Sequence, residues 1–417
     1  MRRVVLVMVL AVSLLAGCGS GDTSTAGGGE VRTVLVDYQH DEFASAFLRY
    51  YPEKVTVRPG DTVRFKQQWT GEPHSVTMGQ VVDKVFGYAE LLQKYDSEEE
   101  ALADGVSQET VDDVLRTMAR IPGMLEWEAG EVYQQGAQTC AIDDLDDVPA
   151  FTTPDDEIDP DATCPNLGEP LPAFNGQGLY NSGFIPYTGE KGNVFDVPLA
   201  DDLEPGTYMY FCNYHWLQMS GQIEVVDKGS AIPSQSEVSS QARREVLEDA
   251  KLPLQQVREA RKTKGGSKIG DLEVPLAGRQ ADEDFAVIIN EFLPKNAGAK
   301  VGEPVTWTFD GAAHTVSFNV PKYFPIFDVR KDGTVFRNPN AYEPVGVEVP
   351  EREEGPPDED PPSLEVDAGE WNGKGGFLSS GELYPGDKFT ITFTKQGTYP
   401  YACVLHPQMV GTVEVRN

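Results

Sequence analysis

Residues 206–215 read GTYMYFCNYH, and residues 397–406 read GTYPYACVLH. Both segments fit the pattern G-T-Y-x-Y-x-C-x-x-H. Each continues into a Met, a Gly two residues later and a stretch that ends in Glu-Val, at residues 219–225 and 409–415. Agreement at so many positions in one order is not a chance event. The chain therefore contains one structural unit twice.

A second shared block lies upstream in each copy. VRPGDTVRF at residues 57–65 precedes His74, and VGEPVTW at residues 301–307 precedes His314. Apolar and polar residues alternate around these turns, as in half-buried strands. The same alternation recurs at Phe389, Ile391 and Phe393, which are separated by Thr residues. Short strands with Gly and Pro turns predict an all-β chain built from sandwiches or barrels.

The first copy has a long insert, at about residues 80–180, between its first His and its Cys. Residues 88–95 favour a helix, and Ser97 stands three residues before Glu100 as in a capping box. Four apolar residues further on have the spacing of one helix face, and we expect them to pack into a core: Val111, Val114, Leu115 and Met118. The insert is thus predicted to be partly helical.

Each copy supplies one thiolate, two imidazoles and one thioether. Soft thiolate and thioether ligands suit Cu(I) and imidazole also suits Cu(II), so this set is typical of a mononuclear electron-transfer copper site. Zinc is the competing metal, but Met is a poor zinc ligand. Four of the five histidines fall in the repeat. The candidate ligands are His74, Cys212, His215 and Met219 in the first copy, and His314, Cys403, His406 and Met409 in the second.

These motifs resemble the cupredoxin family of blue copper proteins, which includes plastocyanin, pseudoazurin and amicyanin. Residues 403–409 have the short C-x2-H-P-x-M loop of amicyanin. The resemblance implies two tandem Greek-key β-sandwiches, each with one type 1 copper. It also implies that His215 and His406 are exposed in apolar patches through which electrons leave.

Two features depart from the family pattern. Residues 212–219 read C-x2-H-x3-M, which leaves Gln218 as an alternative axial ligand, although the shared downstream residues favour Met219. Both copies also have long inserts between the first His and the Cys.

Electron transfer is favoured over two other functions. A copper oxidoreductase of the nitrite-reductase kind places a His beside the type 1 Cys, whereas here the neighbours are Phe211, Asn213, Ala402 and Val404. Only His40 is left over, and one histidine cannot build a second catalytic copper centre. Copper storage or delivery proteins favour Met-rich or Cys-rich sites, and the chain has only eight Met. We therefore expect an electron carrier and not an enzyme.

The first residues predict export and lipid attachment. Arg2 and Arg3 precede an apolar run that is too short to span a bilayer, and the run ends in Leu-Ala-Gly before Cys18. This sequence resembles a bacterial lipobox, with Cys18 as the acylated residue. An ordinary signal peptide with a stray cysteine is the alternative. We expect the protein to be anchored at the outer face of the cytoplasmic membrane.

Export allows a disulfide. Cys140 and Cys164 are the cysteines left once Cys18, Cys212 and Cys403 are assigned, and they lie 24 residues apart in an acidic segment. A Cys140–Cys164 bond is predicted, with two free thiols as the alternative.

The chain carries 67 acidic and 34 basic residues, a net charge of −33. This argues against nucleic acid, which needs clustered Lys and Arg. In so acidic a protein, acidic residues are expected to surround the apolar patches around His215 and His406. This arrangement favours a redox partner whose contact surface has a basic rim, such as a cytochrome or an oxidase. Besides that protein partner we expect contact with the membrane through the lipid.

The expected organisation has five parts. They are a leader at residues 1–17, a lipidated tether at 18–30, a first domain at 31–226, a linker at 227–283 and a second domain at 284–417. The linker contains a predicted basic helix near residues 241–262, which either lies against the acidic domains or is simply solvated.

Overall fold

The computed structural model describes residues 29–417, apart from residues 96, 124, 127–130, 154–158, 160–161, 186–192, 263–266, 271–273, 276–284, 311–312, 331–332, 351 and 353–361. The predicted leader and Cys18 lie outside the described residues. Within the described part of the chain, every helix is too short or too polar to cross a membrane.

The described chain is mostly β-structure, and the first copy of the repeat forms two sheets. One has the order β11 (Val194–Pro198), β5 (Thr62–Gln67), β1 (Val31–Val36), β3 (Tyr50–Tyr51). The other has the order β4 (Lys54–Val57), β13 (Trp216–Val225), β12 (Gly206–Cys212), β6 (Thr77–Met78), β10 (Leu179–Asn181), β9 (Cys140–Ile142).

Within the described residues, the second copy repeats the order of all four strands of the first sheet and of five strands of the second, but it adds β23 (Glu365–Trp371) and has no counterpart of β9. One sheet has the order β17 (Glu291–Leu293), β14 (Ser267–Gly270), β19 (Pro304–Thr308), β25 (Lys388–Phe393), β23. The other has the order β18 (Asn296–Lys300), β27 (Val410–Arg416), β26 (Gly397–Ala402), β20 (Ser317–Phe318), β24 (Leu378–Ser379). The equivalent pairs agree in direction as well: β4 and β18 run parallel to β13 and β27, and β12 and β26 run antiparallel to them. The sequence duplication is therefore also a duplication of topology.

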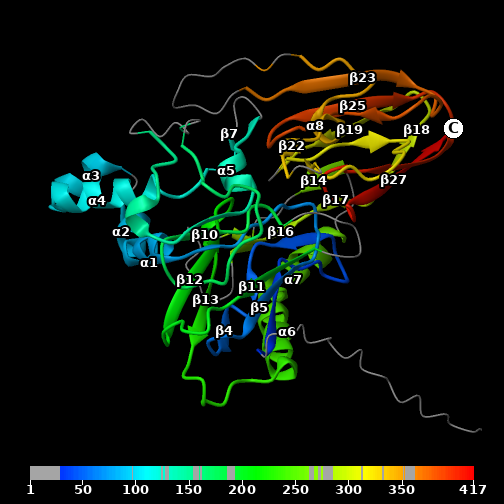
Figure 1. Ribbon diagram of the computed structural model, residues 1–417. Helices are drawn as coiled ribbons and strands as arrows, with labels where there is room; N and C mark the ends of the chain where they lie inside the picture. Colours follow the sequence, from blue (N-terminus) through cyan, green and yellow to red (C-terminus); the bar gives the residue numbers. More distant parts are fainter. Residues whose placement is uncertain are drawn as a thin grey trace, which may run out of the picture.

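Each copy encloses its own apolar core. The inward residues of the alternating stretches are buried as predicted, Val57, Val63 and Phe65 in the first core and Phe389, Ile391 and Phe393 in the second. The Cys and the Met of each candidate site belong to these cores. Figure 1 shows the second unit, in yellow to red, beside the first, in blue to green.

The insert of the first copy is partly helical, as predicted. It contains α1 (Gln80–Gly87), α2 (Ala89–Lys94), α3 (Glu98–Ala103), α4 (Gln108–Met118), α5 (Gln134–Ala137), the 3-10 turn η1 (Leu145–Asp147) and the short strands β7 (Leu125–Glu126) and β8 (Glu131–Val132). Helices α3 and α4 project to one side in Figure 1. The Ser97 hydroxyl accepts a bond from the Glu100 N–H at 3.2 Å and caps α3.

The apolar stripe of α4 is only partly buried. Val111 is buried, but Leu115 is 48% exposed, so the prediction that it packs into a core is wrong. The insert forms a small core of its own, and a projecting helix in so small a unit has too little apolar surface opposite it to cover the whole stripe.

The predicted disulfide is confirmed. Cys140 and Cys164 are bonded, with their Cα atoms 6.0 Å apart. Both lie in the apolar core of the insert, which also contains Phe211, the residue before Cys212. The disulfide therefore fastens the insert directly behind the first candidate site.

The predicted linker helix is present as two helices, α6 (Gln235–Asp249) and α7 (Lys251–Ala260). They are packed and not merely solvated, because Ala242, Val246 and Val257 share a core with Phe47 and Tyr51. Arg258 and Arg261 pair with Glu42 and Glu291. The packed and paired helices match the first of the two alternatives, in which the linker lies against the acidic domains.

Other contacts join the two units. Strand β16 (Phe285–Ile289), which also pairs with β15 (Val274–Pro275), lies antiparallel to β2 (Ser45–Phe47) of the first unit. Phe184 stacks on Phe327 with 4.9 Å between ring centroids. Phe327 begins a hairpin of β21 (Phe327–Val329) and β22 (Val335–Arg337), and α8 (Pro339–Tyr342) follows this hairpin. Gln134 exchanges two hydrogen bonds with the backbone of Val335, at 2.8 and 3.0 Å. The units are thus held in one arrangement by backbone pairing, an apolar cluster and polar contacts.

Candidate metal centres

The first group of candidate ligands gathers at one end of the first unit. Cys212 is the last residue of β12, His215 lies in the turn that follows, and His74 lies in the loop between β5 and β6. The Nδ1 atoms of His74 and His215 are 3.2 Å apart, and the Cys212 Sγ is 3.5 Å from the His215 Nδ1. The tight hairpin of β12 and β13 thus holds Cys212 and His215 together, and the loop between β5 and β6 adds His74, which is far away in the sequence.

The second group has the same geometry. The Nδ1 atoms of His314 and His406 are 3.0 Å apart, and the Cys403 Sγ lies 3.7 and 3.5 Å from them. All three residues are buried. In each group one ligand atom per residue lies within 4.8 Å of the others. Two imidazole nitrogens and one thiol sulfur thus converge on one point in each unit.

The two thiols are set to ionise. Burial by itself raises the pKa of Cys212, but the charge of His215 and the hydrogen bonds from both imidazoles outweigh it, and the pKa falls well below its usual range. The pKa of Cys403 is lowered in the same way, against burial, by His406 and His314. The thiolate is the form of cysteine that binds metals.

Backbone and hydroxyl groups hold each thiol in the same way. The N–H of the residue after the first His, Ser75 or Thr315, points at the sulfur at 3.4 Å in both units. The hydroxyl of that residue accepts a bond from the N–H after the Cys, from Asn213 at 3.1 Å and from Val404 at 2.9 Å. Hydrogen bonds around a ligand sulfur fix its position and tune the potential of a bound metal.

Asp37 orients the first histidine. Its Oδ2 lies 2.9 Å from the His74 Nε2 and accepts a bond from the Thr70 hydroxyl at 2.6 Å. This contact leaves the Nδ1 of His74 to face Cys212. Burial lowers the pKa of His74, but Asp37 and Cys212 together raise it to about 10.

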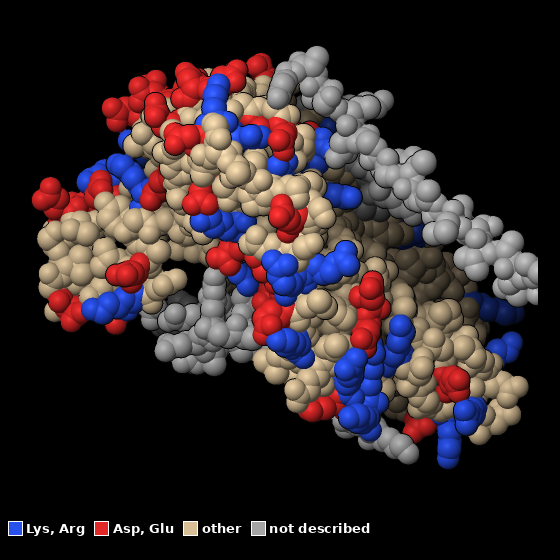
Figure 2. Space-filling view, turned by 90° about the horizontal axis from the view of Figure 1, so that it is seen from below, with Lys and Arg blue, Asp and Glu red and all other residues tan. Residues whose placement is uncertain are grey.

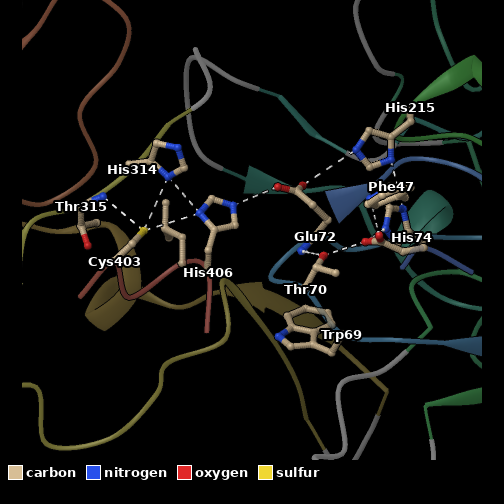
Figure 3. Close-up of polar contacts among 12 residues, drawn as sticks. Phe47, Trp69, Thr70, Glu72, His74, His215, His314, Thr315, Cys403 and His406 are labelled. Carbon is tan, nitrogen blue, oxygen red and sulfur yellow. Dashed lines mark hydrogen bonds and ion pairs between the residues drawn. The ribbon is translucent and has the colours of Figure 1, made fainter. Parts of the chain in front are cut away.

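Glu72 lies between the two groups. Its Oε1 is 3.1 Å from the His406 Nε2, and its Oε2 is 3.9 Å from the His215 Nε2 (Figure 3). Burial raises the pKa of Glu72, but His406 and the other histidines lower it to about 2, so the carboxylate is ionised at neutral pH. His406 responds in the opposite direction, because Cys403 and Glu72 overcome its burial and raise its pKa to about 10.

The expectation that His215 and His406 are exposed to solvent is wrong. The side chains of His215 and His406 are 12% and 5% exposed, because they face one another across Glu72 instead of facing solvent. The neighbouring Leu405 is also buried, whereas Trp216 is 43% exposed.

The two methionines are fully buried next to these groups. Met219 lies in β13 in the core that contains Cys212, and Met409 lies in the core that contains Cys403. The Met409 N–H donates to the His406 carbonyl at 3.0 Å, which closes the short loop. Gln218, the alternative to Met219, is exposed.

Sequence reasoning missed Asp37 and Glu72. Glu72 stands two residues before a candidate ligand, and Asp37 directly follows a strand, but neither position carries a pattern that distinguishes it from the many other acids. His40, the histidine left over, belongs to neither group; it stacks on Phe43 and its Nδ1 accepts the Glu42 N–H.

No protein-family model and no curated protein matches the chain. Among solved structures, part of it is similar to a purple cupredoxin from Nitrosopumilus maritimus, with 19% identity over 37% of this chain and 100% of that chain and a TM-score of 0.18. Two oxidised amicyanin mutants are similar at 20% and 22% identity, each over 29% of this chain and 70% of the other, with a TM-score of 0.16. The described residues of this chain hold two candidate metal groups.

Proposed function

We propose that the chain is an electron-transfer protein with two mononuclear type 1 copper sites, one in each of two cupredoxin-like Greek-key sandwiches. His74, Cys212, His215 and Met219 hold one copper, and His314, Cys403, His406 and Met409 hold the other. Bound copper would supply a one-electron Cu(I)/Cu(II) couple.

The observation that carries this proposal is the duplicated convergence of two Nδ1 atoms on one Sγ atom. A ligand set of two imidazoles and a thiolate, with a weak thioether beside it, is typical of blue copper and suits both oxidation states. Buried Met219 and Met409 fit the thioether role better than exposed Gln218.

The surroundings of the ligands favour a carrier over an enzyme. The hydrogen bonds to both sulfurs and the Asp37 contact hold the ligands in place, which reduces reorganisation between oxidation states. Within the described residues, the groups of His, Cys, Asp and Glu able to hold a metal are these two.

Purified, copper-loaded protein tests the proposal. We expect two coppers per chain, an intense thiolate-to-copper absorption and EPR spectra of type 1 sites. The absorption and the EPR signals should disappear on reduction, while both coppers stay bound. Zinc loading with no visible absorption after exposure to both metals would contradict it.

The axial methionines are expected to tune potential more than affinity. Met409→Leu should raise the reduction potential of the second site, because it removes a donor that stabilises Cu(II), and the colour should remain. Spectroelectrochemical titration measures this shift, with Met219→Leu as the matched change in the first site. Loss of copper from either variant would show a stronger ligand than we propose.

We further propose a redox partner with a basic rim, such as a cytochrome or an oxidase. The net charge of −33 supports it, although acidic and basic side chains are interspersed on the face shown in Figure 2. Exposed Trp216 stacks on Phe211, the neighbour of Cys212, with 5.9 Å between ring centroids, and it offers an apolar contact near the first site.

Charge complementarity speeds encounter and is screened by salt. The rate constant with a basic partner should therefore fall steeply as ionic strength rises, as measured by stopped-flow. Rates that stay flat or rise with salt would contradict the basic rim.

We also propose that lipid on Cys18 anchors the protein at the outer face of the cytoplasmic membrane. A diacyl group anchors firmly, whereas one chain binds only marginally. Cys18→Ser should shift the protein from the membrane fraction to the soluble fraction or leave the leader uncleaved. A wild-type protein found wholly in the soluble fraction would refute the anchor.

A further inference from the structure

The loop between β5 and β6 serves both metal groups. It carries His74, a ligand of the first group, and it also carries Glu72, which reaches His406 of the second. Glu72 and His406 are 334 residues apart in the sequence, and the bond between them crosses the boundary between the two units.

A further hydrogen bond, from Trp69 to Tyr323, holds this loop against the second unit, and one bond within each unit supports this contact. The Trp69 indole N–H donates to the Tyr323 hydroxyl at 2.7 Å, and that hydroxyl donates to the Leu405 carbonyl at 3.1 Å. Gln67 donates to the Glu72 carbonyl at 2.8 Å. The loop is therefore fixed at the residue next to His406.

Gly71 allows the close approach. Its φ of +117° is a conformation that other residues rarely adopt, and a Cβ at this position would overlap the Leu405 carbonyl and the His406 ring. The chain thus has glycine where the backbone of one unit meets the ligand loop of the other.

The two ligand histidines meet Glu72 through the nitrogen atoms that face away from the metal positions. The Nδ1 atoms of His215 and His406 face the sulfurs of Cys212 and Cys403. The Nε2 atoms face the two carboxylate oxygens of Glu72, at 3.9 Å from His215 and 3.1 Å from His406 (Figure 3). The side chain of Glu72 is 16% exposed, and those of the histidines are 12% and 5% exposed. Two imidazoles and one carboxylate therefore lie in a row between the sites, joined by the Glu72–His406 hydrogen bond and by the 3.9 Å contact of Glu72 with His215, with little access for solvent.

We propose that Glu72 joins the two copper sites into one intramolecular electron path. This rests on the proposed function. One electron leaves Cu(I) at one site, which becomes Cu(II), and reduces Cu(II) at the other site to Cu(I). It passes through His215, Glu72 and His406, and no bond or proton moves. The two sites then act in series: one site exchanges electrons with one external partner, and the other site exchanges electrons with a second partner.

Glu72→Gln tests this path in the full, copper-loaded chain. An amide is neutral and has one acceptor oxygen, so it can keep the hydrogen bond to the His406 Nε2 but presents an uncharged group to the His215 Nε2, which the carboxylate faces at 3.9 Å. Glu72→Asp keeps the negative charge but is one methylene shorter, so it cannot reach both rings. Glu291→Gln is the matched control, because this buried carboxylate of the second unit also bonds to the first unit, at the Ala44 N–H, and pairs with Arg261 of the linker, away from the copper ligands.

The measurement is pulse radiolysis with less than one reducing equivalent per chain. Cys212→Ser and Cys403→Ser supply the spectrum of each single site. Wild type should show a redistribution of the electron between the sites at a rate independent of protein concentration. Glu72→Gln and Glu72→Asp should slow this phase by about tenfold or more, while Glu291→Gln keeps the wild-type rate.

Pulsed dipolar EPR tests whether a slower rate comes from the missing carboxylate or from a change in the relative position of the two units. The copper–copper distance in fully oxidised protein should be the same in wild type and Glu72→Gln, so that a slower rate reflects the lost bridge and not a displaced unit. If Glu72→Gln does not retain both coppers, Glu72→Asp decides. An unchanged rate in the variants that retain both coppers, or no concentration-independent phase in wild type, overturns the proposal. Failure to bind two redox-active coppers would instead overturn the proposed function.

Discussion

Cys403→Ser should remove the copper of the second unit and leave that of the first in place. The hydroxyl of serine does not ionise near neutral pH, so the site loses its one anionic ligand and the soft donor that stabilises Cu(I). The two sulfurs lie in separate cores, so the loss should stay local. Metal analysis should give one copper per chain, and the thiolate-to-copper absorption should fall to that of a single site.

Cys212→Ser is the matched change in the first unit. It should also give one copper per chain, and the two residual spectra should add up to that of wild type. A Cys→Ser variant that still holds two coppers with the full absorption would show that the ligand assignment is wrong.

Replacing both Cys140 and Cys164 with Ala should destabilise the first unit by ~3 kcal/mol. Without the bond, the unfolded chain regains the conformational entropy that closing a loop of this length removes. The bond lies in the core of the insert, which packs on Phe211 beside Cys212. The first copper should therefore be released at a lower guanidinium concentration than in wild type. Unfolding curves monitored through the absorption of each site measure this effect.

The second site provides the internal control for this variant. The core around the second site lies in the other unit, so the guanidinium concentration at which the second copper is released should change much less. Two coppers should still bind in the absence of denaturant. Equal release of both coppers, or no shift of the first, would contradict a local role for the disulfide.

The duplicated motif determined the internal organisation of each unit from the sequence alone. Alternation at residues 55–65 and 389–393 placed the buried strand faces, and the spacing from Cys to Met placed three ligands on one hairpin. The Ser97 cap and the disulfide were predictable as well. These features depend on residues close together in the chain or on a small set of cysteines, so spacing and elimination suffice.

The relation between the two units was decided only by the tertiary structure. The contacts of Glu72 with His215 and His406 depend on how two folded surfaces pack, through Gly71, Trp69 and the stacked rings of Phe184 and Phe327. The burial of the two loop histidines follows from the same packing, as does the position of β16 beside β2. No periodicity records such contacts, because a strand's pattern specifies which face is buried within its own unit but not which surface the finished unit meets.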